Sequence, residues 1–218
     1  MDVDSAFVAA LREVVASDEV KPGLLTSPSR LTIGATVELA CLRTVCVPSI
    51  RDIIDQWKTS CPALGRAVNV FQSAALPSGT AMWEPRGLEF FPIRGKSWAD
   101  ERHYHPFESR FRKAAKQAGF GGLADGLCGA LFEMADNVAQ HSAGGCGIPS
   151  PGLIGYYICD GHVTFAISDL GRGVLSSLRD NPMWGTLPDS KAALAAITEQ
   201  HASSRRYGGE GEGLLQGT

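Results

Sequence analysis

The pattern of apolar and polar residues is clearest in the second half of the chain. Three apolar runs have strand length and predict β-strands at residues 88–93, 153–159 and 162–168. Asp160-Gly161 joins the last two runs, which is a strong hairpin signal. Apolar residues at helical spacing predict helices at residues 106–117, 123–141, 174–179 and 190–201. Residues 85–218 are therefore expected to form an α/β domain.

The first half is expected to be a small α/β region of residues 1–84. Helical spacing predicts an amphipathic helix over residues 4–17. Leu, Ile, Val and Thr are frequent in residues 30–48, which favours one or two strands. No motif in this region indicates its role.

Two further elements and a linker complete this half. Ser49 is a candidate N-cap for a helix that continues through Trp57. Residues 67–71 are expected to form a short strand. Proline, glycine and serine concentrate in residues 74–86, which is typical of a linker between two regions.

Composition narrows the class of protein. The chain has 218 residues, of which 44% are hydrophobic and 20% charged, and its net charge is -3. These values are ordinary for a globular protein and give no direct signal of nucleic-acid binding or of a membrane surface. No apolar run reaches the roughly 18 residues of a membrane span, and no signal peptide is visible, so we expect a cytoplasmic protein. The six cysteines lack C-x-x-C spacing and are expected to be reduced thiols rather than zinc ligands.

Glycines are unevenly distributed along the chain. Of 25 glycines, 7 lie in residues 1–120 and 18 lie in residues 121–218. This imbalance fits either a loop-rich second half or a backbone that approaches a ligand closely.

Glu133 and Asn137 lie one turn apart on the predicted helix 123–141. Four apolar residues fall within about 60° of one another on the helical wheel and form the expected buried stripe: Leu127, Leu131, Met134 and Val138. Glu133 and Asn137 are expected beside this stripe, at a cleft edge. There a carboxylate could take a proton from water and an amide oxygen could bind Mg²⁺. Taken alone, the pair also fits a solvated helix surface.

Two glycine-rich segments follow. Asp169 ends a predicted strand, and Gly171 and Gly173 after it allow a sharp turn that would leave the carboxylate facing a cleft. Four glycines in residues 208–213 precede Leu214 and suggest a loop that enters a helix, whose first N–H groups can bind phosphate. Alone, the first segment also fits a simple turn and the second a loose tail.

The order and spacing of these segments resemble the GHKL ATPase superfamily, which includes gyrase, histidine kinases and MutL. Residues 133–142 resemble its N box, residues 167–173 its G1 box and residues 209–214 its G2 box. Ser203-Ser204-Arg205 is similar to the ATP lid of stand-alone bacterial members. The resemblance covers residues 85–218. It implies a two-layer α/β sandwich, the Bergerat fold, with a mixed and mainly antiparallel sheet.

The resemblance also implies roles for the matching residues, with ATP and Mg²⁺ as cofactors. Glu133 matches the general base, Asn137 the Mg²⁺ ligand, and Asp169 the carboxylate that binds the adenine amino group. Gly171 and Gly173 match the glycines that let the backbone pass the base. The lid hinge and the phosphate-contacting helix start match Gly209, Gly211, Gly213 and Leu214. Arg205 and Arg206 could neutralise phosphate charge when the lid closes.

The resemblance leaves several functions open. One is Mg-dependent ATP binding with slow hydrolysis coupled to lid closure. Another is a serine or histidine kinase of the anti-sigma-factor type. A third is a non-catalytic interaction module, either nucleotide-responsive or inert. ATP and ADP are the expected ligands, with a regulatory protein or a second copy as further partners. No phosphoacceptor histidine motif is visible. The sequence ends four residues after Leu214, so we expect a domain truncated after the G2 box, with weakened nucleotide binding and an exposed sheet edge.

Overall fold

The computed structural model describes residues 31–73, 87–95, 98–100, 104–141, 151–159 and 161–200. The predicted helix 4–17, the predicted linker 74–86 and the glycine-rich segment 208–213 lie outside the described residues. The helices are α2 (Ile33–Val45), α3 (Pro48–Ser60), α4 (Pro62–Gln72), α5 (Tyr104–Gln117), α6 (Ala124–His141), α7 (Gly173–Leu178) and α8 (Ser190–Gln200), with a 3-10 turn η2 (Trp98–Asp100). The strands are β1 (Leu88–Ile93), β2 (Gly152–Cys159) and β3 (His162–Asp169).

The three described strands form one antiparallel sheet in the order β1-β2-β3. Leu88 pairs with Tyr157 across β1 and β2, and Cys159 pairs with His162 across β2 and β3. Gly161 has φ +71° in the turn between β2 and β3, a conformation that glycine adopts without strain. The three strands, the hairpin and the four helices predicted in the second half are confirmed, with ends that shift by two residues at most.

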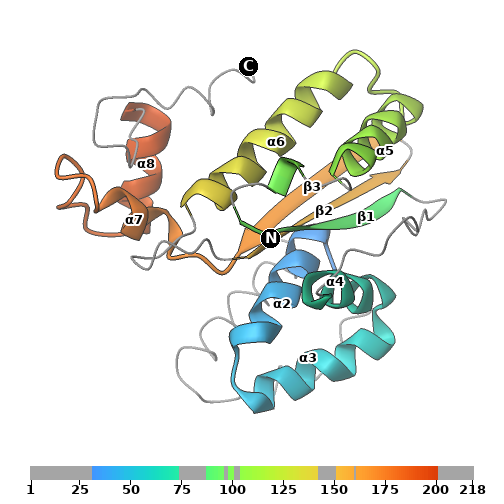
Figure 1. The fold of residues 1–218 in the computed structure, drawn as a ribbon, viewed down its shortest axis with the longest axis horizontal. Helices are drawn as coiled ribbons and strands as arrows, with labels where there is room; N and C mark the ends of the chain where they lie inside the picture. Colours follow the sequence, from blue (N-terminus) through green and yellow to red (C-terminus); the bar gives the residue numbers. More distant parts are fainter. Residues whose placement is uncertain are drawn as a thin grey trace.

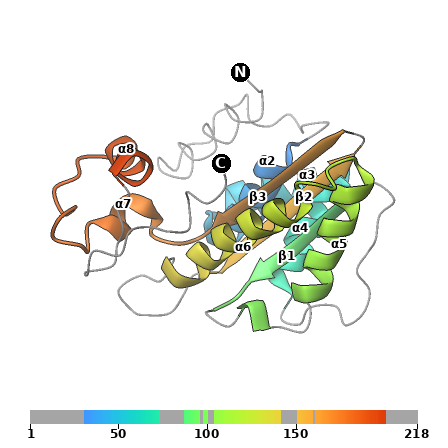
Figure 2. The ribbon, with the colours of Figure 1, turned by 90° about the horizontal axis from the view of Figure 1, so that it is seen from above.

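Helices cover both faces of this sheet. Figure 1 shows α5 and α6 above the strands and α2, α3 and α4 below them. Figure 2, viewed from above, shows α5 and α6 in front of the strands. The described part is therefore a mixed α/β fold of three layers: the sheet and its α5–α6 layer were expected, and the first half of the chain adds a helical layer on the other face.

The strands predicted for the first half are wrong. Residues 33–45 form helix α2, and residues 67–71 lie within helix α4. The β-branched residues that suggested strands, such as Val37 and Val68, are buried in a core shared by these helices and the sheet. Packing on the sheet thus overrides the weak preference of β-branched residues for strands.

The predicted N-cap at Ser49 is also wrong. Val47 holds that position in α3 and caps no N–H with its side chain, and Pro48 occupies the first turn. Proline suits this place because the N–H that it lacks would have no partner within the helix. A side-chain cap occurs instead at α2, where the Ala35 N–H donates to Thr32 Oγ1 at 3.2 Å.

Helix α2 lies close against the sheet at Gly155 of β2. A Cβ atom on Gly155 would stand 2.7 Å from Val37 Cγ1 and 2.9 Å from Ile33 Cδ1. Only a residue without a side chain leaves room for α2 at this distance. Arg94, which follows β1, adds a polar link, since its guanidinium donates to the carbonyl oxygens of Phe71 and Ser73 at the end of α4.

Helix α5 is joined to the opposite face of the sheet by a polar cluster of Glu89, Arg110 and Tyr156. The Tyr156 hydroxyl donates to Glu89 Oε2 at 2.6 Å, and Arg110 Nε donates to the same carboxylate at 3.0 Å. Burial raises the pKa of Tyr156, so its hydroxyl keeps its proton. The cluster lets a buried tyrosine and a partly buried ion pair satisfy one another.

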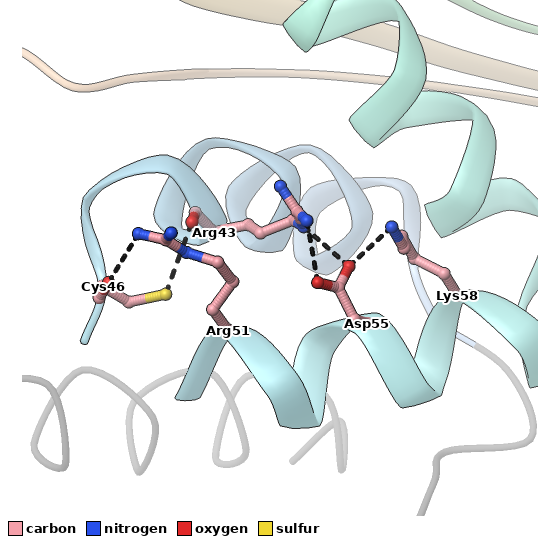
Figure 3. Close-up of polar contacts among 5 residues, drawn as sticks. All are labelled: Arg43, Cys46, Arg51, Asp55 and Lys58. Atoms are coloured by element: carbon pink, nitrogen blue, oxygen red, sulfur yellow. Dashed lines mark hydrogen bonds and ion pairs between the residues drawn. The ribbon is translucent and has the colours of Figure 1, made fainter. Parts of the chain in front are cut away.

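Charged side chains join α2 to α3 in the helical layer (Figure 3). Arg43 donates to both carboxylate oxygens of Asp55, at 2.8 and 2.7 Å, and Lys58 lies 2.5 Å from the same group. Arg51 donates to the carbonyl oxygen of Cys46 at 3.3 Å. The two parallel hydrogen bonds from Arg43 to Asp55 fix α2 and α3 relative to one another more specifically than apolar packing alone.

Helices α7 and α8 form a small lobe, residues 173–200, at one end of the sheet (Figure 1). Its core consists of Leu178, Ala193 and Ala196, which belong to neither of the two larger apolar clusters. Arg179 closes the loop between the helices by donating to the Leu187 carbonyl oxygen at 2.6 Å. The lobe is thus built around its own contacts.

Five cysteines of the described part are free thiols, and four of these are buried. Over the same residues, no helix is both long and apolar enough to cross a bilayer.

Candidate functional site

The buried side of α6 differs from the expected stripe. Its buried residues are Ala124, Cys128, Leu131, Ala135 and Ala139. Met134 is 40% exposed, and Leu127 and Val138 are only partly buried. The helix is therefore rotated relative to the prediction, because its small alanine side chains pack into the apolar core that it shares with α5 and the sheet.

This rotation changes the place of the two N-box candidates. Glu133 and Asn137 are both exposed, and at 100° per residue they lie nearly opposite the buried side. The expectation that they stand beside the buried stripe is therefore wrong. They form a polar pair on the solvent side of α6.

The last turns of α6 meet the end of β3 through Gly152. A Cβ atom on Gly152 would stand 2.8 Å from Val138 Cγ1 and 3.1 Å from the Ser168 carbonyl oxygen. Gly152 is the cross-strand partner of Asp169. Directly paired residues of antiparallel strands project to the same face, so Asp169 projects to the side of the sheet that carries α6.

Asp169 opens a tight turn into the lobe. Its Oδ1 accepts the Gly171 N–H at 2.6 Å, and the Leu170 N–H donates to the Pro151 carbonyl oxygen at 3.2 Å. Gly173 begins α7 with φ +76°. The sharp turn predicted here is present, and the carboxylate of Asp169 is exposed.

The peptide that leads into Asp169 is also held from the opposite face of the sheet. The Cys41 thiol of α2 donates to the Ser168 carbonyl oxygen, with an Sγ···O distance of 3.6 Å. Burial, with smaller effects of Asp169 and Glu38, raises the pKa of Cys41 to about 12. The thiol therefore keeps its proton and acts as a donor at neutral pH.

Arg172, which lies between the two glycines of the turn, binds within the lobe. Its guanidinium forms an ion pair with Asp180 and donates to Ser177 Oγ at 3.4 Å. The positive charge of this arginine is thus largely balanced by a neighbouring carboxylate. It holds the start of α7 against the residues that follow it.

The remaining candidates lie outside the described residues: Arg205, Arg206, Gly209, Gly211, Gly213 and Leu214. Among the described residues, no group of three or more His, Cys, Asp or Glu side chains could hold a metal ion. The available donors are the carboxylates of Glu133 and Asp169 and the amide of Asn137. Such oxygen donors suit a hard cation like Mg²⁺ rather than zinc.

Comparisons of this chain with protein-family models, with curated proteins and with solved structures found no significant match.

Two features of this corner were missed in the sequence. Gly152 stands at the start of a strand, where a glycine can indicate a close approach of another segment. The sequence gives no such signal for Cys41, because residues 30–48 favour strands and the partner Ser168 lies 127 positions further along the chain. Only the packing of α2 on the sheet brings the two together.

Proposed function

We propose that the chain binds Mg-ATP at the corner where α6, the end of β3 and the start of the α7–α8 lobe meet, and hydrolyses it slowly with movement of the lobe. The order of elements from β1 through α5, α6, β2 and β3 supports the Bergerat fold that the sequence motifs imply.

One observation carries this proposal: Asp169 projects to the face of the sheet on which α6 lies. Val138, next to Asn137, packs on the Gly152 backbone, and Gly152 is the strand partner of Asp169. The last turns of α6, which carry Asn137, and the end of β3, which carries Asp169, are therefore neighbouring segments, and this supports the proposal of a shared site.

The proposed roles are those that the resemblance implies, and the chemistry of the side chains is compatible with them. Asp169 accepts a hydrogen bond from the adenine amino group. Asn137 offers its amide oxygen to Mg²⁺, which when bound would neutralise phosphate charge. Glu133 accepts a proton from water. Glu133 is exposed in this structure. To act as a general base it must be covered by a bound nucleotide and by the α7–α8 lobe.

Thermal unfolding tests the binding step. A ligand that binds only the folded state raises the melting temperature, so Mg-ATP should raise it above the value with Mg²⁺ alone. An unchanged melting temperature at millimolar nucleotide would contradict the proposal.

Turnover tests the role of Glu133. The Glu133→Gln variant should lose ATP hydrolysis and retain the shift in melting temperature, whereas Asp136→Asn on the same helix should retain both. Equal hydrolysis by the Glu133 variant and the wild type would remove Glu133 from the mechanism. Labelled γ-phosphate, followed into water or onto a co-purified protein, separates hydrolysis from the kinase alternative.

The exposure of Glu133 and Asn137 favours a second candidate, the inert form of the interaction module, which binds no nucleotide. In that case the polar side of α6 contacts a protein partner, and nucleotide alone produces neither hydrolysis nor a change in stability. The thermal measurement above separates the two candidates.

A further inference from the structure

Asp169 is positioned by groups on both faces of the sheet. On its own face, Gly152 admits Val138 of α6. On the other face, the strand partner of Ser168 is Leu153, which belongs to the core shared with α2. The last peptide group of β3 therefore lies between two helical layers.

Cys41 contacts this peptide group directly. The carbonyl of Ser168 and the N–H of Asp169 belong to the same planar peptide unit. The thiol that donates to this carbonyl belongs to a residue that is only 1% exposed. Its burial excludes competing water, which makes the hydrogen bond stronger than it would be at the surface.

We infer that Cys41 is a positioning residue for Asp169: the helical layer of the first half holds the end of β3 through the thiol, and the Asp169 carboxylate takes its place from that contact. This inference rests on the proposed nucleotide-binding role of Asp169. It gives the otherwise motif-free α2 layer a part in shaping the site.

Loss of the hydrogen bond from Cys41 to Ser168 should move the turn after β3, whereas a general loss of core packing should not. The Cys41→Ala variant removes the donor and leaves the Ser168 carbonyl without it, so the turn from Asp169 to Gly171 should shift. Cys61→Ala is the matched control, since Cys61 is a buried thiol of the same apolar core, at the start of α4. Each variant removes one sulfur atom from this core, so the loss of packing is similar in the two.

The amide resonance of Gly171 reports the position directly, because this N–H donates to Asp169 Oδ1. In the isotope-labelled full chain without nucleotide, Cys41→Ala should move this resonance and Cys61→Ala should leave it unchanged. Cys41→Ala should also weaken binding of a Mg-bound ATP analogue about threefold, as expected for one lost hydrogen bond.

The outcomes separate the two claims. An unmoved Gly171 resonance in Cys41→Ala, or an equal movement in Cys61→Ala, would overturn the positioning role. If the wild type binds no analogue, the proposed function fails, while the resonance measurement still decides whether Cys41 positions Asp169. A moved resonance with unchanged affinity in a binding-competent chain would also overturn the inference, because the contact would then not serve the site.

Discussion

Glycine residues of β2 set the distance between the sheet and its two helical layers. Gly152 faces α6 and Gly155 faces α2, and in both cases a Cβ atom would overlap a valine side chain. Neither is needed for a turn. Their effect is on packing, because protein interiors are filled so closely that one added methyl group lowers stability.

A substitution at Gly152 should therefore destabilise the fold. Gly152→Ala is expected to lower the free energy of unfolding by about 1–3 kcal/mol, since Val138 must move. Gly126→Ala on the exposed side of α6 meets nothing within 4 Å and should raise the free energy by about 0.5–1 kcal/mol through helix propensity. Urea unfolding measures both values. Equal effects of the two substitutions would contradict the close approach at Gly152.

The carboxylate of Asp55 makes a pH-dependent contribution. Hydrogen bonding to Arg43, with a smaller contribution from Lys58, lowers the pKa of Asp55 from 3.8 to about 2. The folded state thus binds the proton less readily than the unfolded chain, so this stabilisation is present above about pH 4 and is lost as the pH falls toward 2.

Asp55→Asn should consequently lower the free energy of unfolding by about 1 kcal/mol at pH 7, a modest value because the pair is partly exposed. The difference from the wild type should shrink toward zero at pH 2. Asp52→Asn, on the exposed side of the same helix, serves as the control and should change little. A destabilisation by Asp55→Asn that is the same at pH 7 and pH 2 would show that the ionised carboxylate is not its cause.

At the scale of helices and strands, the second half of the chain was predictable and the first half was not. The strands of the second half are separated by a clear hairpin turn, and its helices have apolar residues at helical spacing. Both signals are local in the sequence. The β-branched residues of α2 and α4 suggested strands, and only their burial against the sheet explains why they are helical. Local preference is weaker than packing in such cases.

Helix α6, which carries Glu133 and Asn137, shows a second limit of prediction from the sequence. Four larger apolar residues of α6 predicted the buried side, but Leu131 alone of these four is fully buried, and the rest of that side consists of alanines and Cys128. Hydrophobicity alone does not show how closely two elements approach. The positions of Glu133 and Asn137 relative to the core therefore required the structure.

The α7–α8 lobe should open independently of the sheet. Its core is small and separate from the larger clusters, and such units open at lower free energy than the whole protein. Hydrogen exchange should be faster in residues 173–200 than in β2 and β3. Leu178→Ala, which truncates a buried leucine of this core, should speed exchange in the lobe at least about tenfold and leave the sheet unchanged.

The control for the lobe is Leu194→Ala, because Leu194 is 59% exposed on α8. This variant should alter exchange little in either region. Loss of protection throughout the sheet in Leu178→Ala would show that the lobe and the sheet unfold together.

At the scale of the whole molecule, the described residues form one three-layer arrangement with the candidate site at the end of its sheet. The α2 layer and the α6 layer meet the same end of the sheet from opposite faces, through Cys41 at Ser168 of β3 and Val138 at Gly152 of β2. The motifs in the sequence predict which segments belong to the proposed site, and this stays a prediction. The contact of Cys41 with Ser168 could not be predicted, because the two residues lie 127 positions apart in the sequence.

The central claim is that Asp169 binds the base of ATP, and calorimetric titration with a non-hydrolysable ATP analogue and Mg²⁺ tests it most directly. The wild type should bind the analogue, and Asp169→Asn should bind it at least about tenfold more weakly, as expected when a hydrogen bond to a charged group is lost, while its melting temperature without nucleotide stays close to that of the wild type. No binding by the wild type, or equal affinity of the two proteins, would contradict the account.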